Sequence, residues 1–180
     1  SGVNTGSAII TYSLGPGCTV TKAMTVNPVP AGISGAAAIC KGSTTTLATS
    51  AAGGVWQTSG GIATVGSSSG VVTGVSGGAA IISYTLPTGC ASTYTLSVVA
   101  VPALSGIRNM CGWGDTMSVT NGMTTGSYSS TLATVMNLGG GVGLVTAHAP
   151  GTATITYTIA GLGCSTTSTI TVNPIPGAIG

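Results

Sequence analysis

Five cysteines are the side chains of this sequence with the clearest chemistry, and their spacing is regular. Cys18, Cys90 and Cys164 follow one another at intervals of 72 and 74 residues, and Cys40 and Cys111 lie 71 residues apart. Recurring thiols in a chain rich in Gly, Ser and Thr indicate disulfides, which persist in oxidising, extracellular compartments. Because five is an odd number, at least one cysteine must bond outside the chain or stay free.

The sequence contains very few residues that could perform acid–base catalysis or bind a metal. The permanently charged side chains are Lys22, Lys41, Arg108 and Asp115, and the single histidine is His148. One acid and one histidine can form neither a carboxylate pair nor a three-ligand metal site. No nucleophile-elbow pattern supports a serine triad, and one carboxylate is too few for calcium. We therefore predict no enzyme activity, no cofactor and no metal.

The charge balance also restricts the partners. A net charge of +2 offers no cluster of Lys and Arg that could neutralise phosphates, so we expect no nucleic-acid partner. The mean hydropathy is +0.60, yet no apolar run approaches the ~20 residues that a membrane-spanning helix needs. We expect no membrane insertion.

The cysteine spacing belongs to a longer internal repeat. One phrase occurs three times, as GSAIITYSLGPGC at 6–18, GAAIISYTLPTGC at 78–90 and GTATITYTIAGLGC at 151–164. A second apolar segment follows each phrase and ends in a proline-containing linker such as NPVP or NPIP. A period of about 72 residues suits a small independent β-domain and is too long for a solenoid of short turns.

The repeat divides the chain into four parts. Residues 1–24 are predicted to be the C-terminal strand pair of an incomplete repeat, 25–100 and 101–173 two full repeats, and 174–180 the start of a further one. The opening Ser-Gly-Val has the look of a segment cut from a longer precursor. A two-stranded hairpin is marginally stable alone. We therefore expect 1–24 to be completed by preceding chain or by strands from a neighbouring subunit.

The repeated phrase alternates as a half-buried strand does. In its third copy, Ala153, Ile155, Tyr157 and Ile159 fall on one face and four threonines on the other. This period of two predicts an antiparallel strand with the apolar row inside. The corresponding tyrosines of the other copies, Tyr12 and Tyr84, are predicted to be core residues as well.

The strand pattern predicts the fold class. Between residues 25 and 100 we expect seven short strands, near 33–40, 44–48, 54–57, 62–65, 71–75, 79–86 and 95–101, with Gly-, Ser- and Pro-rich turns between them. Seven short strands at this spacing are typical of a two-sheet sandwich. The predicted architecture is therefore all-β, a tandem of two-sheet β-sandwiches with a period of about 72 residues.

At these residues the chain resembles the bacterial immunoglobulin-like domains of group 2, in the cysteine-bearing form of Bacteroidota surface and secreted proteins. The matching segments are CKGSTTTL (40–47), GGVWQTS (53–59), IATV (62–65), GVVTGVSGGAAIISYT (70–85) and TGC (88–90). The second repeat departs from this pattern, because CGWGDTMSV (111–119) replaces the Gly-Ser-Thr turn and no tryptophan corresponds to Trp56. The resemblance implies that the tandem sandwiches are immunoglobulin-like β-sandwiches of about seven short strands. It also implies surface stalks, adhesins and filaments, and no enzyme.

Three further residues have a plain and a functional interpretation. Trp56 sits where the resembled family packs a tryptophan on the core, although an exposed sugar-stacking platform is the alternative. Trp113, in a Gly-flanked turn, is expected to be exposed and to contact another domain or a ligand. Thr116 lies in Asp-Thr-Met, which looks like the short O-glycosylation signal of Bacteroidota; a polar turn entering a strand is the alternative.

Two disulfide arrangements are open. Closed repeats would pair Cys40 with Cys90 and Cys111 with Cys164, leaving Cys18 over. However, the first turn and the last hairpin of a seven-strand sandwich lie at opposite ends, about 17–20 Å apart, and a disulfide needs Cα atoms about 4.4–6.8 Å apart. Head-to-tail stacking instead favours Cys40 with Cys164, with Cys18, Cys90 and Cys111 bonding to other repeats or chains.

These features favour an extracellular structural protein, a segment of a filament, stalk or sheath at the bacterial cell surface. The alternative is a secreted adhesin that binds a glycan or a cell-surface protein through exposed turns. Self-association, head to tail and laterally, is the expected partnership, because the charged residues that keep proteins apart are scarce, at 2%. A head-to-tail contact does not close and therefore propagates.

Overall fold

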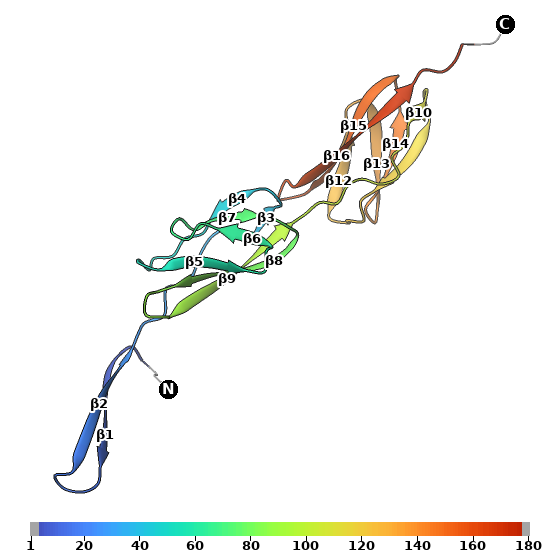
Figure 1. Ribbon diagram of the computed structural model, residues 1–180. Coiled ribbons are helices and arrows are strands. Elements are labelled where there is room, and N and C mark those ends of the chain that lie inside the picture. Colours follow the sequence, from blue (N-terminus) through green and yellow to red (C-terminus); the bar gives the residue numbers. More distant parts are fainter. Residues whose placement is uncertain (1–3, 178–180) are drawn as a thin grey trace.

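The computed structural model describes residues 4–177, and this range contains no helix. Figure 1 shows an elongated molecule in which a hairpin and two β-sandwiches follow one another in chain order. The all-β fold class is therefore confirmed. The predicted parts 1–24 and 174–180 extend beyond the described residues, by 1–3 and 178–180.

Sandwich 1 consists of the two sheets formed by residues 38–99. Its strands are β3 (Ala38–Cys40), β4 (Thr44–Thr46), β5 (Val55–Ser59), β6 (Ala63–Val65), β7 (Val71–Gly74), β8 (Gly78–Thr85) and β9 (Ala91–Val99). One sheet has the order β3-β9-β8-β5 and the other β4-β7-β6. The first strand pairs in parallel with the last, and the other pairs are antiparallel. This arrangement is an immunoglobulin-like sandwich.

Sandwich 2, formed by residues 110–173, repeats the same topology. Its strands are β10 (Met110–Cys111), β11 (Thr116–Thr120), β12 (Gly126–Ser130), β13 (Ala133–Gly139), β14 (Val142–Ala147), β15 (Gly151–Ile159) and β16 (Ser165–Asn173). The sheet orders are β10-β16-β15-β12 and β11-β14-β13. The altered turn of this repeat therefore leaves the strand order unchanged. A β-bulge between Asn137 and Gly139 is the one irregularity in the pairing of β13 with β14.

The segment predicted as one strand over 33–40 divides between the two sheets of sandwich 1. Ser34 bridges Ala48 next to β4, whereas β3 pairs with β9 in the other sheet. Gly35 lies between them with φ +153°, and a Cβ there would collide with Leu47. The predicted continuous strand is wrong because the chain must cross from one sheet to the other at this glycine.

The repeated phrase forms the central strand of each core. In β15, Ala153, Ile155 and Tyr157 are 0% exposed and Ile159 is 6% exposed, while the threonines between them are exposed or partly exposed. The predicted inward row is therefore confirmed. In β8, the corresponding residues Ala80, Ile82 and Tyr84 are buried too.

An aromatic pair packs inside each sandwich. Trp56 is 6% exposed, and its ring centroid lies 4.8 Å from that of Tyr84. Trp56 is therefore a core residue and forms no exposed sugar-stacking platform. In sandwich 2, Tyr128 replaces the tryptophan, with its ring centroid 4.8 Å from that of Tyr157. The sequence comparison between repeats did not single out Tyr128 for this position.

The two core tyrosines also hold a neighbouring loop by their hydroxyl groups. The Tyr84 hydroxyl accepts a hydrogen bond from the Gly54 amide (2.8 Å) and donates one to the Ala51 carbonyl (2.9 Å). Tyr157 makes the same pair of bonds with the Gly126 amide (2.7 Å) and the Met123 carbonyl (3.0 Å). Each tyrosine thus joins the core of its sandwich to the loop that leads into β5 or β12.

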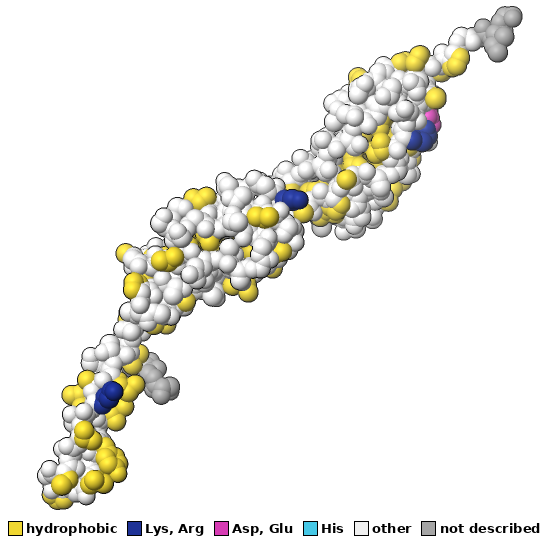
Figure 2. Space-filling model, in the orientation of Figure 1, with side chains coloured by type: hydrophobic (Ala, Val, Ile, Leu, Met, Phe, Trp, Pro, Cys, Tyr) yellow, Lys and Arg dark blue, Asp and Glu magenta, His cyan; other side chains and the backbone are white. Residues whose placement is uncertain are grey.

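The hairpin of β1 (Gly6–Ser13) and β2 (Thr19–Val26) forms a sheet of its own. Its strands pair in register from Gly6 with Val26 to Ser13 with Thr19. Figure 2 shows apolar side chains on its surface, and Tyr12 is 63% exposed. The described residues supply no second sheet to cover the hairpin, so the burial of Tyr12 against preceding chain or a neighbouring subunit stays a prediction.

Candidate functional site: the joint between the sandwiches

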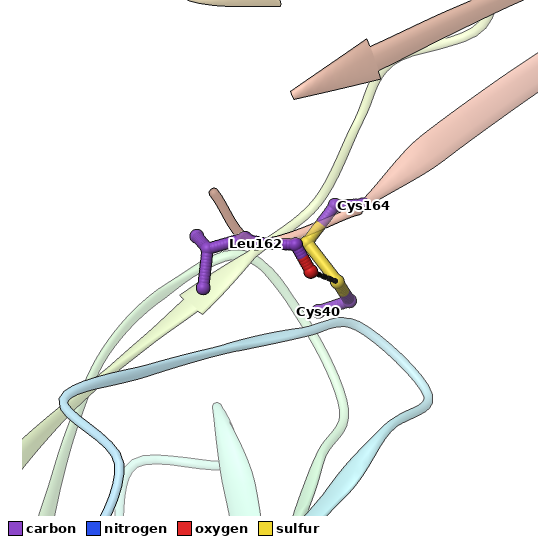
Figure 3. Close-up of a disulfide and its surroundings, with 3 residues drawn as sticks. All are labelled: Cys40, Leu162 and Cys164. Atoms are coloured by element: carbon purple, nitrogen blue, oxygen red, sulfur yellow. Dashed lines mark hydrogen bonds between the residues drawn. A yellow bond between two sulfur atoms is a disulfide. The ribbon is translucent and has the colours of Figure 1, made fainter. Parts of the chain in front are cut away.

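One disulfide joins the two sandwiches. It links Cys40, the last residue of β3, to Cys164, the residue before β16, across 124 positions of sequence, with Cα atoms 5.4 Å apart. Figure 3 shows the bond at the tip of the β15–β16 hairpin, which reaches the end of sandwich 1. The Leu162 carbonyl oxygen lies 3.8 Å from Cys40 Sγ. Because a disulfide sulfur carries no hydrogen, this approach is a packing contact.

Backbone hydrogen bonds position both cysteines. Cys40 pairs in parallel register with Val99 on β9, and the next amide, of Lys41, donates to the Val99 carbonyl (2.8 Å). On the other side, the Ile159 amide donates to the Cys164 carbonyl (2.8 Å) and closes the hairpin turn. Gly163, with φ +71°, supplies the left-handed conformation just before the cysteine.

Apolar side chains surround the disulfide. Cys164 is 3% exposed and belongs to the core of sandwich 2, and Cys40, Val99, Val101 and Leu104 pack against that core. The linker that leaves sandwich 1 is thus part of the packing of sandwich 2. A groove of about 320 Å³ runs beside the bond and is lined by Cys40, Lys41, Gly42, Val99, Val101, Cys164 and Ser165. The joint is therefore a packed contact with a covalent bond across it.

The observed pairing is the one that head-to-tail stacking favoured. The structure contains Cys40–Cys164 and neither Cys40–Cys90 nor Cys111–Cys164. Self-closed repeats are excluded because the first turn and the last hairpin of each sandwich lie at opposite ends, as Figure 1 shows. The hairpin tip of one sandwich instead meets the first turn of the sandwich before it.

The three remaining cysteines are free thiols within the described residues. Cys18 and Cys111 are exposed, and Cys90 is half-buried. Cys18 lies at the tip of the β1–β2 hairpin, and Cys111 ends β10 at the opposite end of the molecule (Figure 1). Cys90 Sγ lies 3.9 Å from the carbonyl oxygen of Asn27, in the segment that connects β2 to sandwich 1.

The single ion pair of the described residues supports the Cys111 turn. Arg108 donates from both terminal nitrogens to the two Asp115 carboxylate oxygens, at 2.9 and 2.8 Å. The Cys111 amide donates to the same carboxylate (3.0 Å). The hydrogen bonds from Arg108 and from the Cys111 amide hold the pKa of Asp115 well below its usual range. The bidentate pair fixes the turn that precedes β11.

Trp113 and Thr116 lie on the surface near Cys111. Trp113 is 73% exposed, and its ring centroid lies 6.2 Å from that of His148, in an edge-on orientation. His148 Nε2 lies 2.9 Å from the Thr134 hydroxyl, so the single histidine has a structural partner. Thr116 is exposed at the start of β11, and its carbonyl accepts a hydrogen bond from Arg108 (2.6 Å). Glycosylation of Thr116 stays a prediction.

Two further properties of residues 4–177 bear on function. This range has no group of three or more His, Cys, Asp or Glu side chains that could hold a metal ion. It also has no helix long and apolar enough to cross a membrane.

No protein-family profile matches the sequence, and no curated protein matches it. Its structure is similar to domains 4 and 5 of the S-layer protein SbsC, with 19% identity and a TM-score of 0.29 over 72% of this chain and 82% of that one. It is also similar to the I9–I11 tandem of titin, with 11% identity and a TM-score of 0.36 over 94% and 74% of the two chains. The human desmocollin-1 ectodomain is similar at 12% identity and a TM-score of 0.31, over 90% and 40%. At these values the matches support no functional inference.

Proposed function

We propose that the protein is an extracellular structural element, a segment of a filament, stalk or sheath built from head-to-tail immunoglobulin-like repeats of the bacterial group 2 type. The observation that carries this proposal is the Cys40–Cys164 bond, which joins two consecutive sandwiches through their ends. A domain that only had to stabilise itself would bond within its own sandwich. A bond across the joint resists bending and separation of neighbouring sandwiches.

The same bond supports an extracellular compartment. Structural disulfides persist where the surroundings are oxidising and are reduced in the cytosol. We therefore place the protein outside the cell, at the bacterial surface or as secreted material. The nearly uncharged surface in Figure 2 favours association with further copies, since little like-charge repulsion opposes contact.

Immunogold electron microscopy of the native cells tests this function. Antibodies against the chain should label long, uniform structures outside the cell, because a structural element must be continuous over many repeats. Label confined to the cytoplasm would contradict the proposal. Dispersed single molecules at the surface would favour the adhesin.

The exposed indole of Trp113 favours the adhesin as a second candidate, because exposed aromatic side chains stack on sugar rings. A glycan array with the wild type and Trp113→Ala checks this. Binding that only the wild type shows would support an adhesin, and the structural function predicts no binding by either protein.

A further inference from the structure

We propose that Cys111 of one copy forms a disulfide with Cys18 of a second copy, so that the end of sandwich 2 receives the β1–β2 hairpin tip of the next molecule. The proposal rests on the structural function proposed above and names the contact by which copies would join. The Cys40–Cys164 joint within the chain supplies its geometry.

The Cys111 end has the backbone frame of the Cys40 end. Cys111 pairs in parallel register with Asn173, as Cys40 does with Val99. The next amide in each case, of Gly112 or Lys41, donates to that partner's carbonyl at 2.8 Å. The first-turn cysteine is therefore held in the same way at both ends, but within residues 4–177 only Cys40 has a hairpin opposite it.

The following residues of the two turns confirm this equivalence and reveal an insertion. The Gly42 amide donates to Gly74 (2.8 Å), and the Gly114 amide donates to the corresponding Ala147 (3.0 Å). Gly114 thus corresponds to Gly42, and Trp113 is an extra residue that projects from the turn. At the Cys40 joint, Gly42 lines the groove beside the disulfide. At the Cys111 end, Trp113 directly precedes Gly114, the counterpart of Gly42. Its indole can therefore cover the tip of a hairpin that docks there.

The Cys18 hairpin presents its thiol as the Cys164 hairpin does. The Leu14 amide donates to the Cys18 carbonyl (2.9 Å), and the Ile159 amide donates to the Cys164 carbonyl (2.8 Å). The glycine before each cysteine has positive φ, +83° at Gly17 and +71° at Gly163. The Cys164 turn is one residue longer. Leu14, 78% exposed at the Cys18 tip, offers an apolar surface for the Trp113 indole.

Cys90 is the competing hairpin cysteine, and its position is less suitable. It is half-buried, with the Asn27 carbonyl oxygen 3.9 Å from its sulfur. The hydroxyl of Ser92 also donates to the Pro30 carbonyl (2.8 Å), which holds the connecting segment on this hairpin. The β1–β2 hairpin and its connecting segment already lie at the end of sandwich 1 that carries Cys90. A second copy reaches Cys18 without displacing them.

The bond requires an oxidant, for which a small-molecule disulfide such as glutathione disulfide suffices. The Cys111 thiolate attacks one sulfur of glutathione disulfide and releases one glutathione. The Cys18 thiolate of the second copy then attacks the Cys111 sulfur of the mixed disulfide and releases the second glutathione. The two protein thiols lose two electrons and two protons, and the oxidant takes them up as two glutathione thiols.

This contact joins different surfaces of the two copies, so it propagates into a fibre. Cys18 and Cys111 lie at opposite ends of the molecule (Figure 1), and one chain therefore cannot bond them to each other. Cys40 is bonded to Cys164 within the chain, and Cys18 and Cys111 would each be bonded to another copy. Cys90 is then the one free thiol in each copy.

Oxidation of the purified chain in a glutathione buffer tests the pairing. The expected result is a ladder of dimers and higher species on a non-reducing gel, which collapses to monomers after reduction. Cys18→Ser and Cys111→Ser should each abolish the ladder. Cys90→Ser is the matched control and should leave it unchanged. Loss of the ladder in Cys90→Ser, or dimers that persist in Cys18→Ser, would overturn the proposal.

Tryptic mass spectrometry of the ladder identifies the partner directly. Cleavage after Lys22, Lys41 and Arg108 separates 1–22, 23–41, 42–108 and 109–180, which contain Cys18, Cys40, Cys90 and the pair Cys111 with Cys164. We expect 109–180 bonded to both 23–41 and 1–22. Bonding of 109–180 to 42–108, to itself, or to 23–41 alone would refute the contact. Extracellular fibres whose copies are joined in another way would refute this contact and leave the proposed function standing.

Discussion

Asp115 is the only acid of the chain, and its carboxylate organises the turn beside Cys111. It accepts two hydrogen bonds from Arg108 and one from the Cys111 amide. A carboxylate held in this way favours its ionised form, so its pKa falls below the usual value. The residue that could have suggested catalysis in the sequence therefore has a structural role.

We expect Asp115 to stay ionised at about pH 3, where an ordinary aspartate is mostly protonated. Since its folded pKa is depressed, its stabilising contribution is complete above the usual value of 3.8 and is lost as the pH falls towards the folded pKa. An NMR titration of the side-chain carboxyl carbon measures this. Arg108→Gln should raise the pKa, and Lys41→Gln should not. An unshifted titration in the wild type would contradict the ion pair.

Ile155 tests the central strand of sandwich 2 at the level of one side chain. Its side chain is 0% exposed, so Ile155→Ala should lower the free energy of unfolding by about 2–5 kcal/mol through lost burial and a cavity. Thr152→Ala, at an exposed position of the same strand, should change it by less than about 0.5 kcal/mol. Urea denaturation followed by circular dichroism compares the two. Equal effects would mean that the two faces are wrongly assigned.

At the scale of the strands, the tyrosine hydroxyls connect each core to the loop before β5 or β12. Tyr157→Phe removes the acceptor for the Gly126 amide and the donor for the Met123 carbonyl. Leaving these partly buried groups unpaired should cost about 1–3 kcal/mol of unfolding free energy. Hydrogen exchange at Gly126 should also become faster.

Tyr12→Phe is the matched control, since Tyr12 has the same place in the repeated phrase but is exposed. It should leave both measurements unchanged. If Tyr157→Phe behaved as the control does, the hydroxyl would have no part in holding the loop.

The strand of the repeated phrase could be predicted in both sandwiches because its signal is local. Alternation in the repeated phrase placed Ile155 and Tyr157 inside, and the period of 72 residues carried the assignment to the other copies. The division of 33–40 between two sheets was not predictable, since it depends on the contact of Gly35 with Leu47. Tyr128 was missed because it aligns with Trp56 only when strands are paired, Tyr128 with Tyr157 and Trp56 with Tyr84.

The site was predictable to a similar degree. Strand counting placed Cys40 and Cys90 at opposite ends of one sandwich and so favoured the observed Cys40–Cys164 bond. The support of the Cys111 turn by Arg108 was not predictable, because seven residues separate Arg108 from Asp115 and nothing in the local pattern brings them together. The projection of Trp113 as an inserted residue appears only when the hydrogen bonds of the two turns are compared.

For the whole molecule, the inter-sandwich disulfide should control how straight the molecule is. We expect the double variant Cys40→Ser and Cys164→Ser to keep both sandwiches folded but to bend at the joint, because only the linker and its apolar contacts then connect them. Small-angle X-ray scattering should show a smaller radius of gyration and a shorter maximum dimension. Cys90→Ser is the control and should match the wild type. An unchanged scattering curve would mean that packing alone keeps the joint rigid.

The position of the disulfide also determines how the chain would respond to tension. A force applied at the two ends passes along β3, through the sulfur–sulfur bond and into β16, so residues 41–163 carry none of it. Those 123 residues amount to roughly 400 Å of contour length at about 3.3 Å per residue, and this length stays unavailable while the bond is intact. In single-molecule pulling, the oxidised chain should therefore extend only by its outer segments. Adding a reductant should then release residues 41–163 to extend. The joint would thus limit the extension of the chain for as long as its disulfide stays oxidised.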